Sequence, residues 1–303
     1  MIRVRDEGRS YQIFYAAVII FMVLVMAACV LPYLYVVSIS FNDATDTMLG
    51  GVSLIPREFT LQNYIAIFSD NTILHAATVS VIRVIAGTFI QVGVTYFAAY
   101  AFRKRRFPGR TWLLFYFMIP AYFNAGIIAN YILYSRIKLL GSFLVYLLPV
   151  AFNFFFMVLI RTFLISSIPV SLEESATIDG ATEFTIMRRI FIPLSKPIIA
   201  TIALYSAVYH WNDWTTTLLY ADKNPSIYTL QYILMKLLRD AQAMAQAIIK
   251  AAMNGQTVTG SPSVTPESIR NAQIVITTIP IILVYPFVQR YFIKGIMIGA
   301  VKE

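Results

Sequence analysis

The chain has 303 residues, of which 58% are hydrophobic and 13% are charged, and its formal net charge is +9. A soluble domain carries about twice that fraction of charged residues, so the composition excludes a soluble globular protein and places the chain in a membrane. The positive charge does not indicate a nucleic-acid partner, because the basic residues flank apolar segments and do not form one patch. A single cysteine, Cys29, excludes an intrachain disulfide.

Several apolar segments reach the length of about 20 residues that a membrane-spanning helix needs. They are residues 12–40, 73–102, 111–134, 143–165, 198–220 and 272–293. The sequence therefore predicts an all-α, polytopic membrane protein with about six transmembrane helices in one domain, residues 12–293. The first segment is expected to be retained, because it stays apolar beyond Cys29 and is too long for the core of a signal peptide.

The distribution of basic residues predicts the orientation. Most of the 24 Lys and Arg residues lie on one side of the membrane if both termini are cytoplasmic, and the run Arg103–Arg106 is the strongest anchor. The predicted cytoplasmic segments are the tails 1–11 and 294–303 and the loop 166–197, whereas the loops 41–72 and 221–271 are extracytoplasmic. In the second of these loops, Leu230–Leu238 has the spacing of an amphipathic helix, and Gly255–Pro266 has the composition of a loop.

The cytoplasmic loop between the fourth and fifth segments predicts two short helices joined by a turn. Ser171 and Glu174 have the spacing of a capping box at the start of the first helix. Gly180 permits a tight turn, and Pro193 ends the second helix. Composition alone would favour an ordinary amphipathic helix pair at the membrane surface.

A spaced motif in this loop changes that interpretation. It reads E-x-A, three residues, G, nine residues, I-x-I-P. The motif resembles the EAA loop of ABC importer permeases, which docks the membrane subunit onto its ATPase. Ser175 replaces the usual alanine and Ile192 the usual leucine, and both changes are small. The resemblance implies that the following residues couple the chain to an ATPase: Glu174, Ser175, Ala176, Asp179, Gly180, Ile190 and Pro193.

The sequence holds no G-x-x-x-x-G-K-[ST] motif and no Gly-rich turn between a strand and a helix. The chain is therefore expected to be a transport subunit without catalytic residues or a cofactor of its own. ATP and magnesium would be bound by the partner ATPase.

The resemblance extends over essentially the whole chain. The run His210-Trp211-Asn212-Asp213-Trp214 and the ending Tyr285–Gly295 are similar to maltose-type, sugar-importing permeases. The ending resembles a branch that imports oligosaccharides from complex, often acidic polysaccharides, such as galacturonides, aldouronates and alginate fragments. The resemblance implies the type I ABC importer fold, alternating access and a place in the inner (cytoplasmic) membrane. The implied partners are a second, homologous permease, two ATPase subunits and an extracytoplasmic sugar-binding protein.

Polar residues inside apolar spans are costly and usually face a cavity or a partner. Helical spacing predicts one polar face in residues 198–220, formed by Ser206, His210, Asp213 and Thr217 and flanked by tryptophans. Asn153 lies within residues 143–165 among phenylalanines. The candidate residues of the substrate pathway are Arg83, Asn153, Ser206, His210, Trp211, Asn212, Asp213, Trp214 and Thr217.

These candidates have ordinary alternatives. Tryptophans near span ends commonly form an interfacial belt, and a single asparagine commonly joins two helices. Arg83 has three alternatives, which are an acidic sugar, a carboxylate of a partner subunit and a headgroup reached by snorkelling. A metal site is not predicted, because no second His or Cys lies near His210.

Three other functions remain as alternatives. One is an ion-gradient-driven secondary sugar carrier, although the sequence shows no pair of Gly/Pro-broken helices and no acidic ion site in mid-span. Another is an ABC permease for a solute other than a sugar. The third is a scaffold that only recruits the ATPase.

Overall fold

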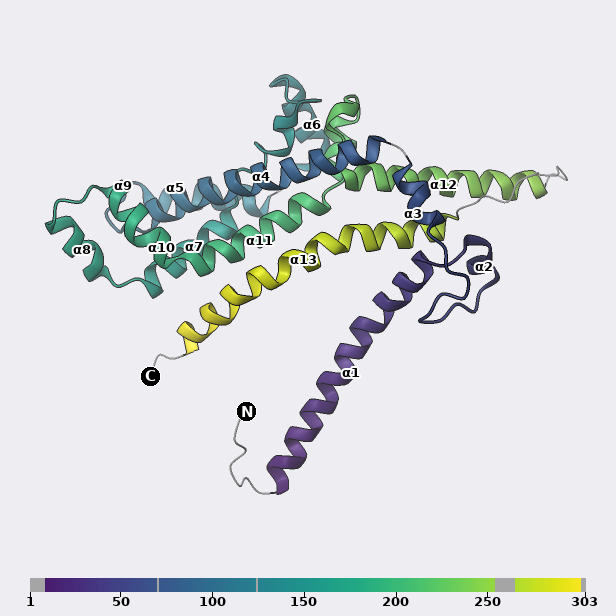
Figure 1. The fold of residues 1–303 in the computed structure, drawn as a ribbon. Coiled ribbons are helices and arrows are strands. Elements are labelled where there is room, and N and C mark those ends of the chain that lie inside the picture. Colours follow the sequence, from purple (N-terminus) through teal and green to yellow (C-terminus); the bar gives the residue numbers. More distant parts are fainter. Residues whose placement is uncertain (1–8, 70, 124, 254–264, 301–303) are drawn as a thin grey trace. The chain divides into compact units, whose positions relative to one another are not determined.

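The structure is a computed structural model that describes residues 9–69, 71–123, 125–253 and 265–300 (Figure 1). The described residues form helices and one isolated antiparallel bridge, between Asn42 and Phe59, but no sheet. The predicted all-α fold is confirmed. The ends of both predicted tails and most of the predicted loop Gly255–Pro266 lie outside the described residues.

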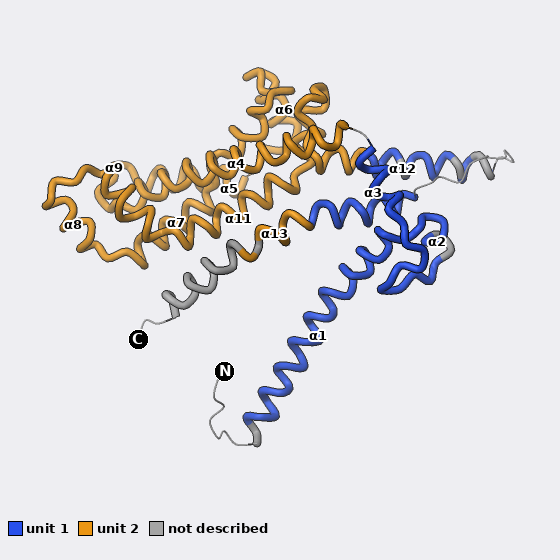
Figure 2. Tube along the Cα trace, in the orientation of Figure 1, with its two compact units in different colours: residues 1–70, 237–278 blue, residues 71–236, 279–303 orange. Residues whose placement is uncertain are grey.

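The chain divides into two compact units, which Figure 2 colours separately. Unit 1 comprises residues 1–70 and 237–278, and unit 2 comprises residues 71–236 and 279–303. Two helices, α12 (Leu230–Met253) and α13 (Pro266–Ala300), pass from one unit to the other. The candidate coupling and pathway residues all belong to unit 2.

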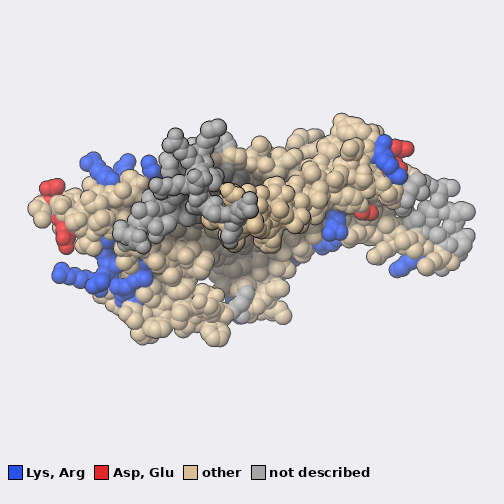
Figure 3. Space-filling view, turned by 90° about the horizontal axis from the view of Figure 1, so that it is seen from below, with Lys and Arg blue, Asp and Glu red and all other residues tan. Residues whose placement is uncertain are grey.

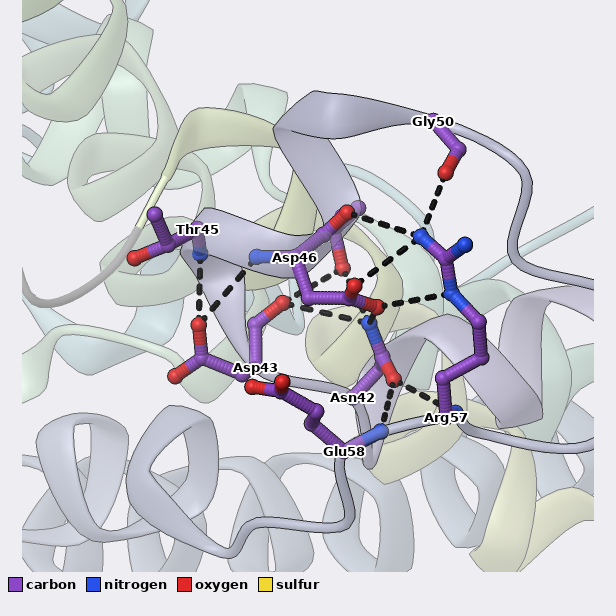
Figure 4. Close-up of polar contacts among 8 residues, drawn as sticks. Asn42, Asp43, Thr45, Asp46, Gly50, Arg57 and Glu58 are labelled. Atoms are coloured by element: carbon purple, nitrogen blue, oxygen red, sulfur yellow. Dashed lines mark hydrogen bonds and ion pairs between the residues drawn. The ribbon is translucent and has the colours of Figure 1, made fainter.

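Unit 1 begins with α1 (Arg9–Ser40), whose apolar side chains are mostly exposed. Two short helices follow, α2 (Ala44–Leu49) and α3 (Gln62–Phe68). The fully buried Asn42 orders this segment (Figure 4). Its side-chain amide donates to Thr47 Oγ1 at 3.0 Å, and its side-chain oxygen accepts from the backbone N–H of Arg57 at 2.9 Å and of Glu58 at 3.0 Å. Residues 42–58 of the predicted loop 41–72 are therefore held together by hydrogen bonds of their own.

Unit 2 is built on three helices that pack side by side, α4 (Asn71–Arg103), α7 (Phe154–Ser167) and α11 (Lys196–Asn212) (Figure 1). The core between them includes Ala99, Met157, Ile160 and Ile202, all fully buried. Two further helices of this unit are α5 (Arg110–Tyr122) and α6 (Gly126–Arg136). Burial of apolar side chains at about 25 cal/mol per Å² holds this bundle together.

Three described helices are long and apolar enough to cross a membrane, at Tyr11–Ser40, Asn71–Arg103 and Pro266–Val284. Three bent helix pairs bring the total to as many as six if each pair is one span. The structure thus agrees with a polytopic helical protein, but several segments differ from the continuous helices that the apolar runs suggested.

The segment 111–134 is divided between α5 and α6, and α5 contains Pro120. The segment 143–165 starts with a 3₁₀ turn, η1 (Phe143–Tyr146), and α7 begins only at Phe154. The segment 198–220 ends its α-helix at Asn212 and continues in a π turn, η3 (Thr217–Ala221). Hydropathy reports apolar length but not the backbone breaks that prolines and caps introduce.

A 3₁₀ turn, η4 (Pro225–Ile227), leads into α12. The helix predicted from Leu230–Leu238 continues to Met253. In its first turns Leu230, Ile233 and Leu234 are buried, whereas Met244 farther along is exposed. The apolar spacing in Leu230–Leu238 therefore predicted the buried part of a longer helix.

Candidate coupling site and buried polar cluster

The predicted coupling motif begins on α8 (Val170–Ile178). The helix ends at Asp179, and Gly180 follows with a φ of +76°, a left-handed conformation that favours glycine. The N–H of Ala181 then donates to the carbonyl of Ala176 at 2.9 Å. Gly180 therefore forms the turn that the sequence predicted.

The predicted capping box is wrong. α8 starts before Ser171, its N-cap is Pro169, and no side chain caps it. Pro169 fixes the backbone at the entrance to the helix, so Glu174 is not needed as a capping partner. Instead the side chain of Glu174 is exposed and has neither a hydrogen-bond nor an ion-pair partner among the described residues.

The motif residues of α8 mostly face outward. Glu174, Ser175, Asp179 and Gly180 are exposed, and Ala176 is half-buried against the core. The neighbouring Ile178 is also exposed. A carboxylate and an apolar side chain are thus presented together on a short helix, which is what a docking surface requires.

The second half of the loop contains α9 (Glu183–Ile186), a π turn η2 (Met187–Phe191) and α10 (Ile192–Leu194). Ile190 is half-buried in the core, and Pro193 is exposed. The helical run Glu183–Leu194 meets α11 at an angle of 79°. At this bend the buried Ser195 hydroxyl donates to the carbonyl of Phe191 at 2.6 Å and lies 2.8 Å from the Tyr96 hydroxyl of α4.

The end of α4 holds the loop through charged contacts. Arg103 donates two hydrogen bonds to Glu173, at 2.7 and 2.9 Å. Lys104 forms an ion pair with Glu183, and the Tyr100 hydroxyl donates to Glu183 Oε2 at 3.0 Å. The hydrogen bonds from Arg103 lower the pKa of Glu173 below its ordinary value.

Sequence reasoning missed these contacts. The sequence identifies Arg103 and Lys104 only as part of the positive anchor Arg103–Arg106, and it does not single out Glu173 or Glu183. Figure 3 shows blue basic side chains near the end of unit 2 that carries α8. The available signal was the pair Glu173 and Glu183, which lie ten positions apart in a loop next to a basic helix end. This signal does not specify which acidic residue pairs with which basic residue.

A second set of contacts lies nearer the start of α4. The Arg83 side chain is 1% exposed and forms an ion pair with Asp213. Its Nη1 also donates to the Asp213 carbonyl at 2.8 Å, and its guanidinium lies 4.4 Å from the centre of the Tyr146 ring. The Tyr146 hydroxyl lies 2.9 Å from Thr217 Oγ1. Arg83 therefore has an intrachain partner, which was not among the three alternatives predicted for it.

The predicted polar face is buried but is not one continuous helical face. Helix α11 ends at Asn212, and Asp213 is extended, so helical spacing does not reach Thr217. Ser206 and Thr217 are fully buried, and the His210 ring packs against Gly87 of α4. These side chains are enclosed between helices.

The remaining pathway candidates lie in different surroundings. Asn153 is the N-cap of α7, where its side chain accepts from the Phe156 N–H at 3.0 Å, and it does not lie within a helix. Trp214 is half-buried and Asn212 is exposed. Trp211 lines an apolar pocket with Val81, Pro280 and others. A second groove, of about 810 Å³, is also mainly apolar and contains none of the candidates.

Among the described residues, no three His, Cys, Asp or Glu side chains gather as a metal site would require. The contacts at the two sites are ion pairs, hydrogen bonds and packing. Contacts of these kinds can couple the movement of one helix to that of its neighbour.

Comparison with known proteins decides the family. The family described as "binding-protein-dependent transport system inner membrane component" matches residues 91–298, which include the whole coupling loop. The chain belongs to this family. It is an ABC transporter permease, a membrane subunit without a catalytic site, as the resemblance implied.

The permease is similar to proteins of known systems. Protein LplC of Bacillus subtilis (strain 168) is 37% identical over 99% of both chains. The polygalacturonan/rhamnogalacturonan transport system permease protein YtcP of the same strain is 35% identical over 93% of this chain and 96% of YtcP.

A solved structure supports the fold of the permease. A chain of a bacterial ABC transporter involved in the import of the acidic polysaccharide alginate superimposes with a TM-score of 0.79 at 28% identity, covering 95% of this chain and 100% of that one. The expected type I permease fold is thereby confirmed.

Proposed function

We propose that this permease imports oligosaccharides, of the uronate-containing type found in pectin and alginate fragments, by alternating access driven by ATP hydrolysis in partner subunits. The main support is α8, which presents the exposed carboxylate of Glu174 beside the Gly180 turn. The names of YtcP and of the alginate transporter support the substrate class. Both systems handle polysaccharides built on acidic sugars.

The proposed assembly contains a second, homologous permease, two ATPase subunits and an extracytoplasmic binding protein. In this assembly α8 docks onto one ATPase, with Glu174 as the ion-pair partner and Gly180 at the point of closest approach. The loop 166–197 and both termini are then cytoplasmic, because the ATPase is. The basic side chains near α8 agree with this orientation.

Recognition of an acidic sugar is proposed to come mainly from other subunits. Arg83 is buried and paired with Asp213, so its charge is already neutralised within this chain. A sugar carboxylate would have to displace Asp213 from a buried pair, which is unfavourable. We therefore assign the choice of acidic sugars to the binding protein and the second permease.

The buried cluster acts on transport through helix packing in this proposal. Arg83 and Asp213 hold α4 against the end of α11, and His210 packs on Gly87 between the same helices. Alternating access needs helices that move as bodies, and enclosed polar contacts keep two helices in one relative position.

Uptake into vesicles tests the proposal. Vesicles that contain both permeases and both ATPase subunits should accumulate galacturonate or alginate oligosaccharides only with ATP and the binding protein. Glu174→Ala should reduce ATPase retention and uptake, whereas Ser171→Ala, an exposed change on the same helix outside the motif, should have no effect. Uptake driven by an ion gradient without ATP would establish a secondary carrier instead. Neutral solutes as the only substrates would contradict the proposed class.

A further inference from the structure

Arg103, the last residue of α4, touches separate parts of the coupling loop. Its guanidinium makes the paired hydrogen bonds to Glu173 of α8 and lies 4.1 Å from the centre of the Phe191 ring in η2. The adjacent Lys104 forms an ion pair with Glu183 of α9. The residues at this helix end thus contact three of the helical parts of the loop, α8, α9 and η2.

The geometry of these contacts fixes orientation as well as distance. A guanidinium that shares two parallel N–H···O bonds with a carboxylate cannot rotate about the contact, unlike a lysine. Phe191 is 1% exposed and supports the guanidinium from the side of the core. The Arg103 and Glu173 side chains are 10% and 18% exposed, so water and salt screen the pair only partly.

We propose that Arg103 is the positioning residue that fastens the coupling loop to α4. The loop is covalently continuous with α7 and α11, so movement at α8 reaches those two helices through the chain itself. The polar contacts of Arg103, Lys104 and Tyr100 with Glu173 and Glu183 link α8 and α9 to the end of α4. This inference rests on the proposed docking of α8 to an ATPase.

The positioning role is distinct from docking. Glu173 and Glu174 are neighbours, but Glu173 turns to Arg103 while Glu174 stays exposed. Removal of Glu174 should weaken the hold on the ATPase. Removal of Arg103 should leave the ATPase bound and allow α8 to move without α4.

The test uses the complete transporter in vesicles, with Arg103→Gln and the nearly isosteric Glu173→Gln. In each variant the amount of ATPase that copurifies and its KM for ATP should match wild type. Sugar transported per ATP should fall about tenfold, the effect of losing ~1.4 kcal/mol from a charge-assisted hydrogen bond. Arg105→Gln is the matched control: it removes the same charge from an exposed neighbour and should change neither value.

A charge-swapped double variant and spin-label distances distinguish a positioning role of Arg103 from a general loss of stability. The exchange Arg103→Glu with Glu173→Arg should recover part of the lost transport, and Arg103→Lys should lie between wild type and Arg103→Gln. Spin labels at Ser171→Cys and Arg106→Cys, in a Cys29→Ser background, should show a narrow distance distribution that Arg103→Gln broadens. Both labelled positions are exposed.

Two results would overturn the inference. One is normal transport per ATP in both Arg103→Gln and Glu173→Gln, and the other is an unchanged distance distribution in Arg103→Gln. Absence of ATP-dependent uptake by wild type would reject the proposed function, while the distance measurement would still decide whether Arg103 fixes α8.

Discussion

At the scale of single residues, the contact between Gly87 and His210 leaves no space for a larger residue on α4. A Cβ atom at position 87 would lie 2.4 Å from His210 Nε2 and 2.8 Å from its Cδ2. Gly87→Ala should therefore destabilise the permease by about 1–3 kcal/mol through overpacking. Thermal unfolding in detergent measures this effect. Gly93→Ala is the control, because a Cβ there would meet no described residue within 4 Å. Adding His210→Ala to Gly87→Ala should restore stability.

Asp213 neutralises the buried charge of Arg83, so replacing Asp213 should lower the stability of the permease. Asp213→Asn leaves the Arg83 guanidinium without a negative partner at 1% exposure. Stability should fall by about 3–5 kcal/mol, as for other broken buried ion pairs. The apolar pair Arg83→Met with Asp213→Leu should unfold at a temperature closer to wild type. If Asp213→Asn abolished uptake while the unfolding temperature stayed normal, a direct contact with sugar would be the better explanation.

The lowered pKa of Glu173 leads to a prediction of how the coupling loop responds to pH. Its pKa lies below the ordinary 4.5, chiefly because Arg103 donates hydrogen bonds to the carboxylate, with Lys104 adding a second positive charge. A lowered pKa stabilises the fold above the ordinary value, and this stabilisation is lost as pH falls through the lowered pKa. The spin-label distribution between α4 and α8 should thus stay narrow from about pH 8 to about pH 5. Broadening near neutral pH would contradict this, and Glu173→Gln should remove the acid-induced change.

At the scale of the element, Gly180 has two separable roles in the α8 turn. Its φ of +76° costs a β-branched residue about 1–2 kcal/mol, whereas asparagine tolerates the left-handed region. Among the residues that the structure describes, a Cβ at position 180 would meet nothing within 4 Å. Gly180→Val should therefore weaken both the turn and ATPase retention. Gly180→Asn should keep the unfolding temperature but still lose ATPase, as measured by copurification. Full ATPase retention by Gly180→Asn would mean that glycine serves only the turn.

At the scale of the whole molecule, the orientation of the chain follows from where its charges and its coupling loop must lie. With Cys29→Ser as background, Arg105→Cys should react with an impermeant thiol reagent only in inside-out vesicles, and Lys236→Cys only in spheroplasts. Both positions are exposed. The positive-inside preference of the run Arg103–Arg106 is the physical reason. Reaction of position 105 from outside intact spheroplasts would reverse the proposed topology.

The sequence by itself determined the class of protein, the family and the location of the coupling loop. Apolar length is a property of composition, so the helical membrane fold follows from it directly. The turn at Gly180 was also predictable, because glycine adopts the left-handed backbone conformation of a tight turn more readily than other residues. These features depend on neighbours along the chain and need no knowledge of distant contacts.

Only the tertiary structure decided which polar groups meet. Arg83 and Asp213 are 130 residues apart, and Arg103 and Glu173 are 70 apart, so no local pattern pairs them. The helix breaks at Asn153 and Asp213 were missed because hydropathy reports apolar length and not backbone caps. Charge pairing depends on which helices pack together, and packing is settled by the fit of whole surfaces.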